Sequence, residues 1–204
     1  MGNACNGDAQ SNSQNVNRLK KKMSSNARDV TISECKVVIL GDSAVGKTSI
    51  ALRYLENKFM DSHIVTLGAQ FQQPKITLKN GNMLKLNLWD TAGEEKFRSM
   101  LPMYYKSARG AILTYDIGNK QSFNSVHYWI EALNEHVKAE NTVLLLVGNK
   151  SDLPPEDRQV ETKVAAKLAE EHNMIFREVS AKTGDGVNDL FTSLAEELVT
   201  RFGL

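Results

Sequence analysis

The eight residues from Gly41 to Thr48, GDSAVGKT, constrain the fold of this chain more than any other stretch. They fit the pattern G-x-x-x-x-G-K-[ST] of a phosphate-binding loop. A β-branched run at 35–40 precedes the loop and predicts a buried strand, and residues 49–57 have helical composition without Gly or Pro. A strand, a glycine-containing loop and a helix in this order are what a phosphate site requires. A chance glycine turn before a helix is the alternative, and the flanking strand and helix argue against it.

The residue types in this loop indicate how it would hold phosphate. Gly41 and Gly46 permit backbone angles that a Cβ would resist, so successive N–H groups can turn toward phosphate oxygens at the positive end of the helix. Lys47 is expected to reach the β- and γ-phosphates, and the Thr48 hydroxyl to ligate Mg²⁺. The loop residues that we predict to contact nucleotide are Asp42, Ser43, Ala44, Val45, Gly46, Lys47, Thr48 and Ser49.

The remainder of the chain alternates between strand and helix patterns. We predict further strands at 70–78, 83–89, 110–117, 142–147 and 174–179, and helices at 123–137, 160–169 and 187–202. Pro74 places its strand at a sheet edge, and Asn80-Gly81 predicts a hairpin to the next strand. The sequence therefore predicts a three-layer α/β domain, in which helices cover both faces of a six-stranded, mostly parallel sheet with one antiparallel edge strand. Ligands bind such sheets at the carboxyl ends of the strands.

Asp90 and Gly93 follow the strand at 83–89, within the sequence WDTAGEE. An Asp at a strand end can hold Mg²⁺ through water, and Gly93 lets its N–H approach a γ-phosphate closely. Many turns contain D-x-x-G. After a phosphate loop and a strand, however, this pattern indicates the second half of a metal–phosphate site.

Asn149, Lys150 and Asp152 follow the strand at 142–147 as N-K-x-D. The carboxylate of Asp152 can accept both N–H donors on one edge of guanine, a pair that adenine lacks. Asn149 can bridge to the ring and to a loop, and the stem of Lys150 can lie along the base. A plain turn before Pro154-Pro155 is the alternative for these residues taken alone.

Ser180, Ala181 and Lys182 follow the last predicted strand. A backbone N–H at Ala181 can bind the carbonyl oxygen of a base. The tripeptide alone carries little information, so its place after the sixth strand is what favours a nucleotide-binding role. A P-loop ATPase is an alternative function, and Asn149 and Asp152 argue against adenine.

Taken in this order and spacing, GDSAVGKT, WDTAGEE, NKSD and SAK resemble the motifs of small Ras-superfamily GTPases, and within them the Rab family. The resemblance covers about residue 34 to the C-terminus. Residues 66–71, TLGAQF, resemble the first Rab switch, and residues 102–105, PMYY, resemble the second switch of the endosomal Rab branch. The resemblance implies a P-loop GTPase domain that binds GTP or GDP with Mg²⁺, hydrolyses GTP and acts as a monomeric switch in vesicle traffic.

The resemblance also implies roles for single residues and for partners. Thr66 would bind Mg²⁺ together with Thr48 and Asp90, and Phe59 would stack on guanine. The exposed hydrophobic triad that Rab effectors bind would be Phe71, Trp89 and Tyr104. A place in the core at the sheet edge is the alternative for this triad. The other expected partners are a guanine nucleotide exchange factor and a GTPase-activating protein, with no nucleic acid.

The catalytic residues implied by the resemblance are Lys47, Thr66 and the residue that follows D-T-A-G. Most Rabs have Gln there to orient the attacking water, whereas this chain has Glu94. An ionised Glu only accepts hydrogen bonds, and its charge would face a γ-phosphate of the same sign. We therefore expect slow intrinsic hydrolysis. A hydrolysis-deficient module held in its GTP form is the alternative function.

Residues 1–33 form a polar tail that we predict to be disordered, ahead of a GTPase domain at 34–204. Five basic and two acidic residues give the tail a charge of +3, against +1 for the whole chain. Its start, MGNACN, approaches the N-myristoylation signal, with Asn6 where Ser or Thr is expected. Gly2 and Cys5 are therefore candidate acylation sites, and an ordinary polar tail is the alternative.

The chain ends without the prenylated cysteines that Rabs usually carry, a departure that a truncated sequence would also produce. A few plant and protist Rabs replace prenylation with N-terminal acylation, and this tail resembles theirs. No apolar run approaches the ~18 residues needed to span a bilayer. Two cysteines are too few for a disulfide framework and favour a reducing compartment. We predict a protein that cycles between the cytosol and the cytoplasmic face of endosomal or other vesicle membranes.

Overall fold

The strand that precedes the phosphate loop lies inside a mixed sheet. The computed structural model describes residues 31–61, 66–93, 101–137 and 141–204. Its strands are β1 (Ile32–Leu40), β2 (Ala69–Gln72), β3 (Lys75–Thr77), β4 (Met83–Thr91), β5 (Gly110–Asp116), β6 (Val143–Asn149) and β7 (Ile175–Glu178). Their order is β2-β4-β1-β5-β6-β7, with β3 also paired to β4. β2 and β3 are antiparallel to β4 and the other pairs are parallel, as predicted.

The predicted edge strand is interrupted, so the sheet has seven strands where the sequence indicated six. β2 and β3 flank Gln73 and Pro74, and both pair with β4. Proline has no N–H to donate to the ladder, although the Pro74 carbonyl still accepts a hydrogen bond from Leu86 N at 2.9 Å. The predicted hairpin turn is confirmed, with Gly81 at φ 87° between β3 and β4.

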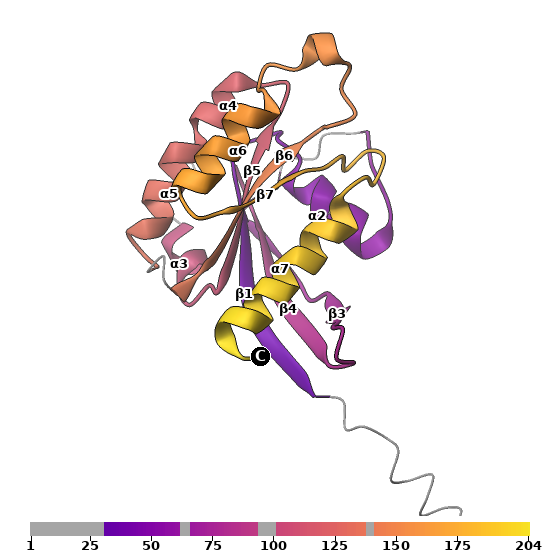
Figure 1. Ribbon diagram of the computed structural model, residues 1–204, viewed down its shortest axis with the longest axis vertical. Helices are drawn as coiled ribbons and strands as arrows, with labels where there is room; N and C mark the ends of the chain where they lie inside the picture. Colours follow the sequence, from indigo (N-terminus) through magenta and orange to yellow (C-terminus); the bar gives the residue numbers. More distant parts are fainter. Residues whose placement is uncertain (1–30, 62–65, 94–100, 138–140) are drawn as a thin grey trace, which may run out of the picture. The chain divides into compact units, whose positions relative to one another are not determined.

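Helices cover both faces of this sheet (Figure 1). On one face lie α2 (Lys47–Glu56) and α7 (Val187–Phe202). On the other face lie α3 (Leu101–Tyr105), α4 (Lys120–Asn124), α5 (Val126–Asn134) and α6 (Thr162–Glu171). A short 3₁₀ helix, η3 (Pro155–Asp157), joins β6 to α6. The three layers of the predicted α/β fold are therefore present.

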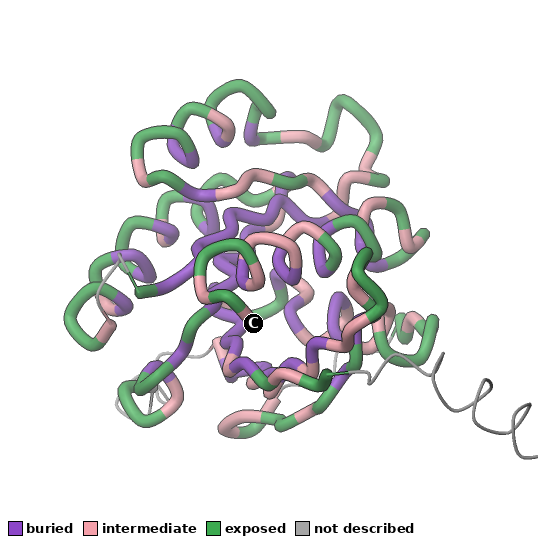
Figure 2. The backbone as a smooth tube through the Cα atoms, turned by 60° about the horizontal axis from the view of Figure 1, so that its bottom comes forward, coloured by how far each residue is buried: buried purple, intermediate pink, exposed green. Residues whose placement is uncertain are grey.

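Alternate residues of β1 enter two separate hydrophobic cores. Val37 and Ile39 pack with α2 and α7, whereas Val38 and Leu40 pack with α5 and α6. All four are fully buried, because a parallel strand covered on both faces exposes neither side. Figure 2 shows buried residues along the central strands and exposed residues on the outer turns of the helices. The sheet is thereby a rigid base for the loops at its carboxyl edge.

Two predicted helices differ from their sequence pattern. The pattern at 123–137 is divided between α4 and α5 at Ser125, whose hydroxyl donates to the Gln121 carbonyl at 3.1 Å and competes with the helical ladder. Val160 precedes α6, and Val164 is 51% exposed, so Ala165 takes the inward position instead.

Residues Ile32–Leu204 form one compact unit. The predicted tail at 1–33 lies outside the described residues up to residue 30, including Gly2 and Cys5, and there it remains a sequence prediction. Its predicted end is too late, because β1 begins at Ile32. Within the described part of the chain, no helix is both long and apolar enough to cross a membrane.

Candidate nucleotide site

A cavity of about 370 Å³ lies where the loops that follow β1, β4, β6 and β7 meet. The predicted nucleotide residues that line it are Ser43, Ala44, Gly46, Lys47, Thr48, Ser49, Phe59, Thr66, Gly93, Asn149, Lys150, Asp152, Ala181 and Lys182. The lining residues that the sequence did not indicate are Leu52, Lys58, Met60, Asp61 and Leu153. Four stretches that were predicted separately therefore share one cavity at the carboxyl edge of the sheet.

Two glycines of the phosphate loop occupy positions where a side chain would collide. Gly41 has φ 141°, and an added Cβ would lie 2.2 Å from the Thr114 carbonyl oxygen. Gly46 has φ 96°, and an added Cβ would lie 2.1 Å from Nδ2 of Asn149. The loop therefore wraps tightly against β5 and β6, and α2 begins directly after it.

Lys47 places a buried ammonium group at the floor of this loop. Its Nζ donates to the carbonyl oxygens of Gly41 and Asp42, at 2.8 and 2.7 Å. Burial lowers the pKa of Lys47 to about 8, and the carboxylates of Asp90 and Asp42 oppose the shift. A buried cation with so few counter-charges favours an anionic ligand beside it.

Three oxygen-bearing side chains predicted to serve Mg²⁺ come together. Thr48 Oγ1 donates to Asp90 Oδ2 at 2.6 Å and lies 2.8 Å from Thr66 Oγ1. The second oxygen of Asp90, Oδ1, is buried and has no hydrogen-bond partner within the described residues. Burial raises the pKa of Asp90, and the Thr48 hydrogen bond and Lys47 oppose this. A nearby cation would stabilise the ionised Asp90 carboxylate and so relieve this shift.

This donor set fits Mg²⁺, which prefers hard oxygen ligands and usually takes only one or two from the protein, with phosphate and water completing its shell. Among the residues that the structure describes, no group of three or more His, Cys, Asp or Glu could hold a metal ion alone. The site therefore fits a magnesium ion that arrives with a phosphate ligand.

Asp42 and Gly93 connect the phosphate loop to the rest of the domain. Gly93 lies so close to the Asp42–Ser43 peptide that an added Cβ would be 2.4 Å from it. The Asp42 side chain does not line the cavity, and its Oδ1 instead accepts a hydrogen bond from Trp129 Nε1 of α5 at 3.0 Å. The prediction that Asp42 contacts nucleotide is therefore not matched by its side chain, which anchors the loop.

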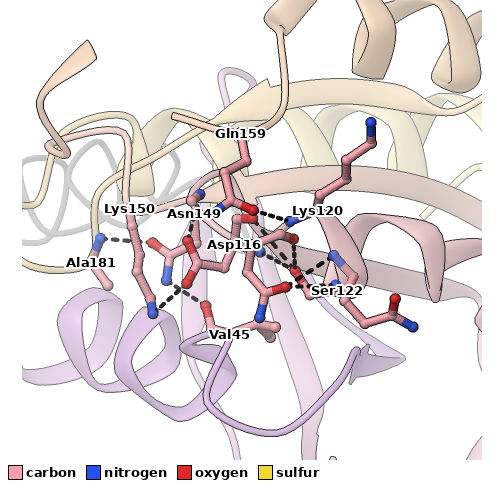
Figure 3. Close-up of polar contacts among 11 residues, drawn as sticks. Val45, Asp116, Lys120, Ser122, Asn149, Lys150, Gln159 and Ala181 are labelled. Carbon is pink, nitrogen blue, oxygen red and sulfur yellow. Dashed lines mark hydrogen bonds and ion pairs between the residues drawn. The ribbon is translucent and has the colours of Figure 1, made fainter. Parts of the chain in front are cut away.

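Asn149 holds together two loops at the other end of the cavity (Figure 3). Its Nδ2 donates to the Val45 carbonyl at 2.8 Å, and its Oδ1 accepts from Ala181 N at 3.1 Å. The predicted bridge from Asn149 to a loop is thus present. The N–H of Ala181, which we expected to face a base carbonyl, is engaged with Asn149, and Val45 meets Asn149 rather than the cavity.

Asp152 is held by the loop that follows β7. Its Oδ1 accepts a hydrogen bond from Ser180 Oγ at 2.6 Å, and its Oδ2 lies 4.0 Å from Lys182 Nζ. Ser180 Oγ in turn accepts from Thr183 N at 3.0 Å. Ser180 therefore does not line the cavity, but it fixes the carboxylate that does.

Lys150 has a partner that the sequence patterns did not reveal. Its Nζ forms an ion pair of 2.5 Å with Oδ2 of Asp116, and its backbone has φ 67°. Asp116 ends β5 and lies opposite Asn149 in the register of β5 and β6 (Figure 3). The signal that could have identified it is an Asp at the carboxyl end of a strand, the same rule that identified Asp90.

Phe71, Trp89 and Tyr104, the triad named from the resemblance, form a continuous aromatic row. The ring centroids of Phe71 and Trp89 are 4.9 Å apart, and those of Trp89 and Tyr104 are 5.4 Å apart. Phe71 is 48% exposed, whereas Trp89 and Tyr104 are partly buried against the core shared with α5 and α6. The triad thus combines an exposed end with a buried base.

Glu94 lies outside the described residues, so its predicted catalytic place remains a prediction.

Comparison with known proteins adds an independent line of evidence. A family model described as the Ras family matches residues 36–200. Ras-related protein Rab-5B of Plasmodium falciparum is 39% identical over 202 residues, which cover 99% of this chain and 96% of that protein. GTP-binding protein ypt5 of Schizosaccharomyces pombe is 44% identical over 169 residues, or 83% and 79%. Ras-related protein Rab-18 of Lymnaea stagnalis is 41% identical over 173 residues, or 85% and 84%. All the loops around the cavity lie within the region matched by the family model.

Proposed function

This chain belongs to the Ras family of small GTPases and, within it, to the Rab proteins, and we propose that it is a switch of endosomal or other vesicle traffic whose GTP form binds effectors. One observation supports this proposal above the others. A single cavity is lined at one end by the buried ammonium of Lys47 and by Thr48, which donates to the incompletely paired Asp90 carboxylate. At the other end it is lined by Asn149 and Asp152, each held by hydrogen bonds to neighbouring loops. Such an arrangement fits phosphate with Mg²⁺ at one end and guanine at the other.

Competition between nucleotides tests the proposal directly. GTP and ATP are titrated separately against the protein loaded with a fluorescent GDP. We expect GTP to displace the probe at far lower concentration than ATP, because Asp152 accepts the paired N–H donors that only guanine presents. Equal displacement by ATP would favour the ATPase alternative.

The described residues have distinct roles in this proposal. Lys47 and the loop N–H groups hold the β- and γ-phosphates, and Thr48, Thr66 and Asp90 hold Mg²⁺. When bound, the ion neutralises charge that develops on the phosphate oxygens during hydrolysis. Phe59 packs against guanine from the loop after α2. The stem of Lys150 lies along the base.

Thr66 and Gly93 are the proposed sensors of the γ-phosphate. Thr66 is three residues before β2. The carbonyl of Gly68, which directly precedes β2, accepts a hydrogen bond at 2.7 Å from the N–H of Ala92, the residue before Gly93. The two sensing segments therefore meet at the edge of the sheet, next to Phe71. Loss of the γ-phosphate would release both segments and alter the surface that effectors bind.

The effect of Glu94 on GTP hydrolysis distinguishes an ordinary switch from the alternative function, a hydrolysis-deficient module held in its GTP form. Like charges ~4 Å apart repel by about 4 kcal/mol at an effective dielectric near 20, so a Glu beside the γ-phosphate is expected to turn away. We expect Glu94→Gln to speed single-turnover GTP hydrolysis with little change in nucleotide affinity. Hydrolysis by the parent at the same rate or faster would contradict this role. A GTPase-activating protein that supplies its own catalytic groups would raise either rate.

Gly2 and Cys5 are proposed to carry acyl chains that attach the protein to membranes. One myristoyl chain gives a binding constant of only about 10⁴ M⁻¹, so stable attachment needs a second signal. Acylation of Cys5 and the lysines at 20–22 would provide it, at about 1 kcal/mol for each basic residue. Gly2→Ala and Cys5→Ser variants are expected to leave membranes in cells. If both remain there as the parent does, the anchor lies elsewhere.

A further inference from the structure

Arg53, in the last turn of α2, donates hydrogen bonds to two separate loops of the nucleotide cavity. Its Nε donates to the Ala181 carbonyl at 2.8 Å and its Nη2 to the Lys182 carbonyl at 2.6 Å. Its Nη1 donates to the carbonyl oxygen and to Oδ1 of Asn57, at 2.9 and 3.0 Å. We propose that Arg53 is a positioning residue that fixes both loops in the geometry that binds guanine, an inference that rests on the nucleotide-binding role proposed above.

The loop that follows β7 is held from two sides. Ala181 and Lys182 line the cavity, where the Ala181 N–H donates to Asn149. Their carbonyl oxygens are bound by Arg53 from α2. Gly184 lies over the same side chain, since an added Cβ would be 3.4 Å from Arg53 Cδ. The guanidinium and Asn149 therefore hold the same loop through different backbone groups.

The loop that leaves α2 is held by the same guanidinium. Asn57 is the C-cap of α2 with φ 51°, and its N–H donates to the Arg53 carbonyl at 3.0 Å. Arg53 Nη1 returns two hydrogen bonds to Asn57, so the direction of the chain after the helix is set locally. Phe59, which is two residues farther along, lines the cavity and packs against the hydrophobic core.

Arginine is suited to this task by its geometry rather than by its charge. The guanidinium is a planar fork with five N–H donors, which here reach three carbonyl oxygens and one amide oxygen. A lysine ammonium is a single point charge and cannot reach both loops together. Because one group joins the two loops, a partner that displaces the chain after α2 also loosens the hold on Ala181 and Lys182. We infer that Arg53 thereby couples the position of the loop after α2 to retention of the base.

Release of a fluorescent GDP from the full chain, measured against excess unlabelled GDP, tests this role. Arg53→Ala and Arg53→Lys are both expected to release GDP about tenfold faster than the parent, because charge-assisted hydrogen bonds are lost in each. Arg177→Ala is the matched control, since Arg177 bonds only the Phe176 carbonyl and Ser193 Oγ among the described residues. It is expected to release GDP at the parent's rate.

The ratio of GDP to IDP affinity separates positioning from general stability. IDP lacks the exocyclic amino group of guanine, which would donate a hydrogen bond to the Asp152 carboxylate. Since Ser180 holds Asp152 from the loop that Arg53 fixes, the ratio is expected to fall in the Arg53 variants. A loss of stability alone would weaken both nucleotides equally and leave the ratio unchanged. Thermal unfolding is recorded for every variant, and Arg53→Lys carries the test if Arg53→Ala does not fold.

The possible outcomes distinguish this inference from the function on which it rests. If the parent prefers guanine nucleotides but both Arg53 variants keep its release rate and its GDP-to-IDP ratio, the positioning role is wrong and the proposed function stands. If Arg53→Lys alone matches the parent, charge rather than fork geometry acts there, which also overturns the inference. If the parent shows no preference for guanine, the proposed function itself is wrong.

Discussion

The two ends of the nucleotide cavity are held in opposite ways. At the base end, polar groups satisfy one another, because Asn149 bridges two loops and Ser180 donates to Asp152. At the phosphate end, burial lowers the pKa of Lys47 and raises that of Asp90, and Asp90 Oδ1 has no partner among the described residues. The first end is complete within the chain, and the second is completed by what binds to it.

This difference separates recognition from affinity. A satisfied network holds its acceptors in fixed positions, so it selects a base by the pattern of donors that the base presents. Buried charges with few counter-charges lower the free energy of unfolding. An oppositely charged ligand offsets this cost when it binds. We therefore expect most of the binding energy at the phosphate end and most of the selectivity at the base end.

Removing the charge at Lys47 should have the largest effect. In Lys47→Ala we expect GTP affinity to fall by about 100-fold or more, because hydrogen bonds between the ammonium and phosphate oxygens are lost. Thr48→Asn should weaken Mg²⁺ and triphosphate together, since the hydroxyl ligand is removed. Calorimetry with GTP and Mg²⁺ measures both, and Lys120→Ala, at an exposed lysine of α4, is the control. Unchanged affinity in both variants would mean that the loop is only structural.

Replacing Lys47 should stabilise the nucleotide-free protein, although it weakens GTP binding. A pKa lowered from 10.5 to about 8 corresponds to a penalty of about 3 kcal/mol for keeping this cation buried at neutral pH. Lys47→Met should therefore raise the free energy of unfolding without ligand, by about 1–3 kcal/mol. Urea denaturation after removal of nucleotide measures this. A variant that is less stable than the parent would show that the hydrogen bonds to Gly41 and Asp42 outweigh the burial cost.

Asp152 should control selectivity more than affinity for phosphate. In Asp152→Asn an acceptor pair becomes a group that also donates, so guanine should lose about 2–3 kcal/mol of binding free energy. ATP binding should stay as weak as in the parent. Competition against fluorescent GDP measures both nucleotides, with Asp157→Asn, an exposed Asp of η3, as control. If GTP and ATP weaken equally, the base end has no separate role in selectivity.

Raising the pH should weaken binding through Lys47. The folded pKa is depressed, so the burial penalty is fully present below pH 8 and is lost as pH rises from about 8 to 10.5. Stability without nucleotide should therefore rise across this window, while GDP affinity falls by at most about tenfold per pH unit. Lys47→Met should show neither trend. Proton uptake on GDP binding at pH 8.5, measured by calorimetry in buffers of different ionisation enthalpy, is the second check.

The ion pair between Asp116 and Lys150 should give the smallest effect. Because the Lys150 side chain is 35% exposed, solvent screens the pair, and Asp116→Asn should cost about 1 kcal/mol of GDP affinity or less. The amide can still accept from Gly118 N, so the loop should keep its shape. Fluorescent GDP binding at low and high salt measures the change. A loss as large as that of Asp152→Asn would mean that Lys150 depends on Asp116 for its position.

Local patterns predicted the phosphate loop, the strands that precede each motif and the antiparallel edge strand. They could do so because glycine, proline and β-branched residues determine the conformation of the backbone nearest to them. The division at Pro74 and the break at Ser125 were missed, although both have local causes. The spacing of apolar residues does not show where a proline lacks an N–H or where a serine hydroxyl bonds a helix carbonyl. Exposure of Val164 shows that a helical spacing alone does not select which face turns inward.

The contacts that hold the site together were beyond such patterns. Arg53 bonds a loop 128 residues away, and Trp129 bonds a loop 87 residues away. These pairings depend on how α2 and α5 pack against the sheet, which no window of sequence contains. Motifs therefore identified most of the residues that line the cavity, and only the packed structure revealed the residues that hold these in place.

Because Trp129 donates a hydrogen bond to Asp42 of the phosphate loop, we expect its fluorescence to change when a ligand binds there. The chain has two tryptophans. The indole of Trp129 touches the phosphate loop, while that of Trp89 lies between Phe71 and Tyr104, with Lys36 Nζ 5.5 Å from its ring centre. Indole emission changes with hydrogen bonding and nearby charge. Replacing either residue by phenylalanine would leave a single tryptophan. Trp129 alone would then report on the phosphate loop, and Trp89 alone on the aromatic surface, without any attached dye.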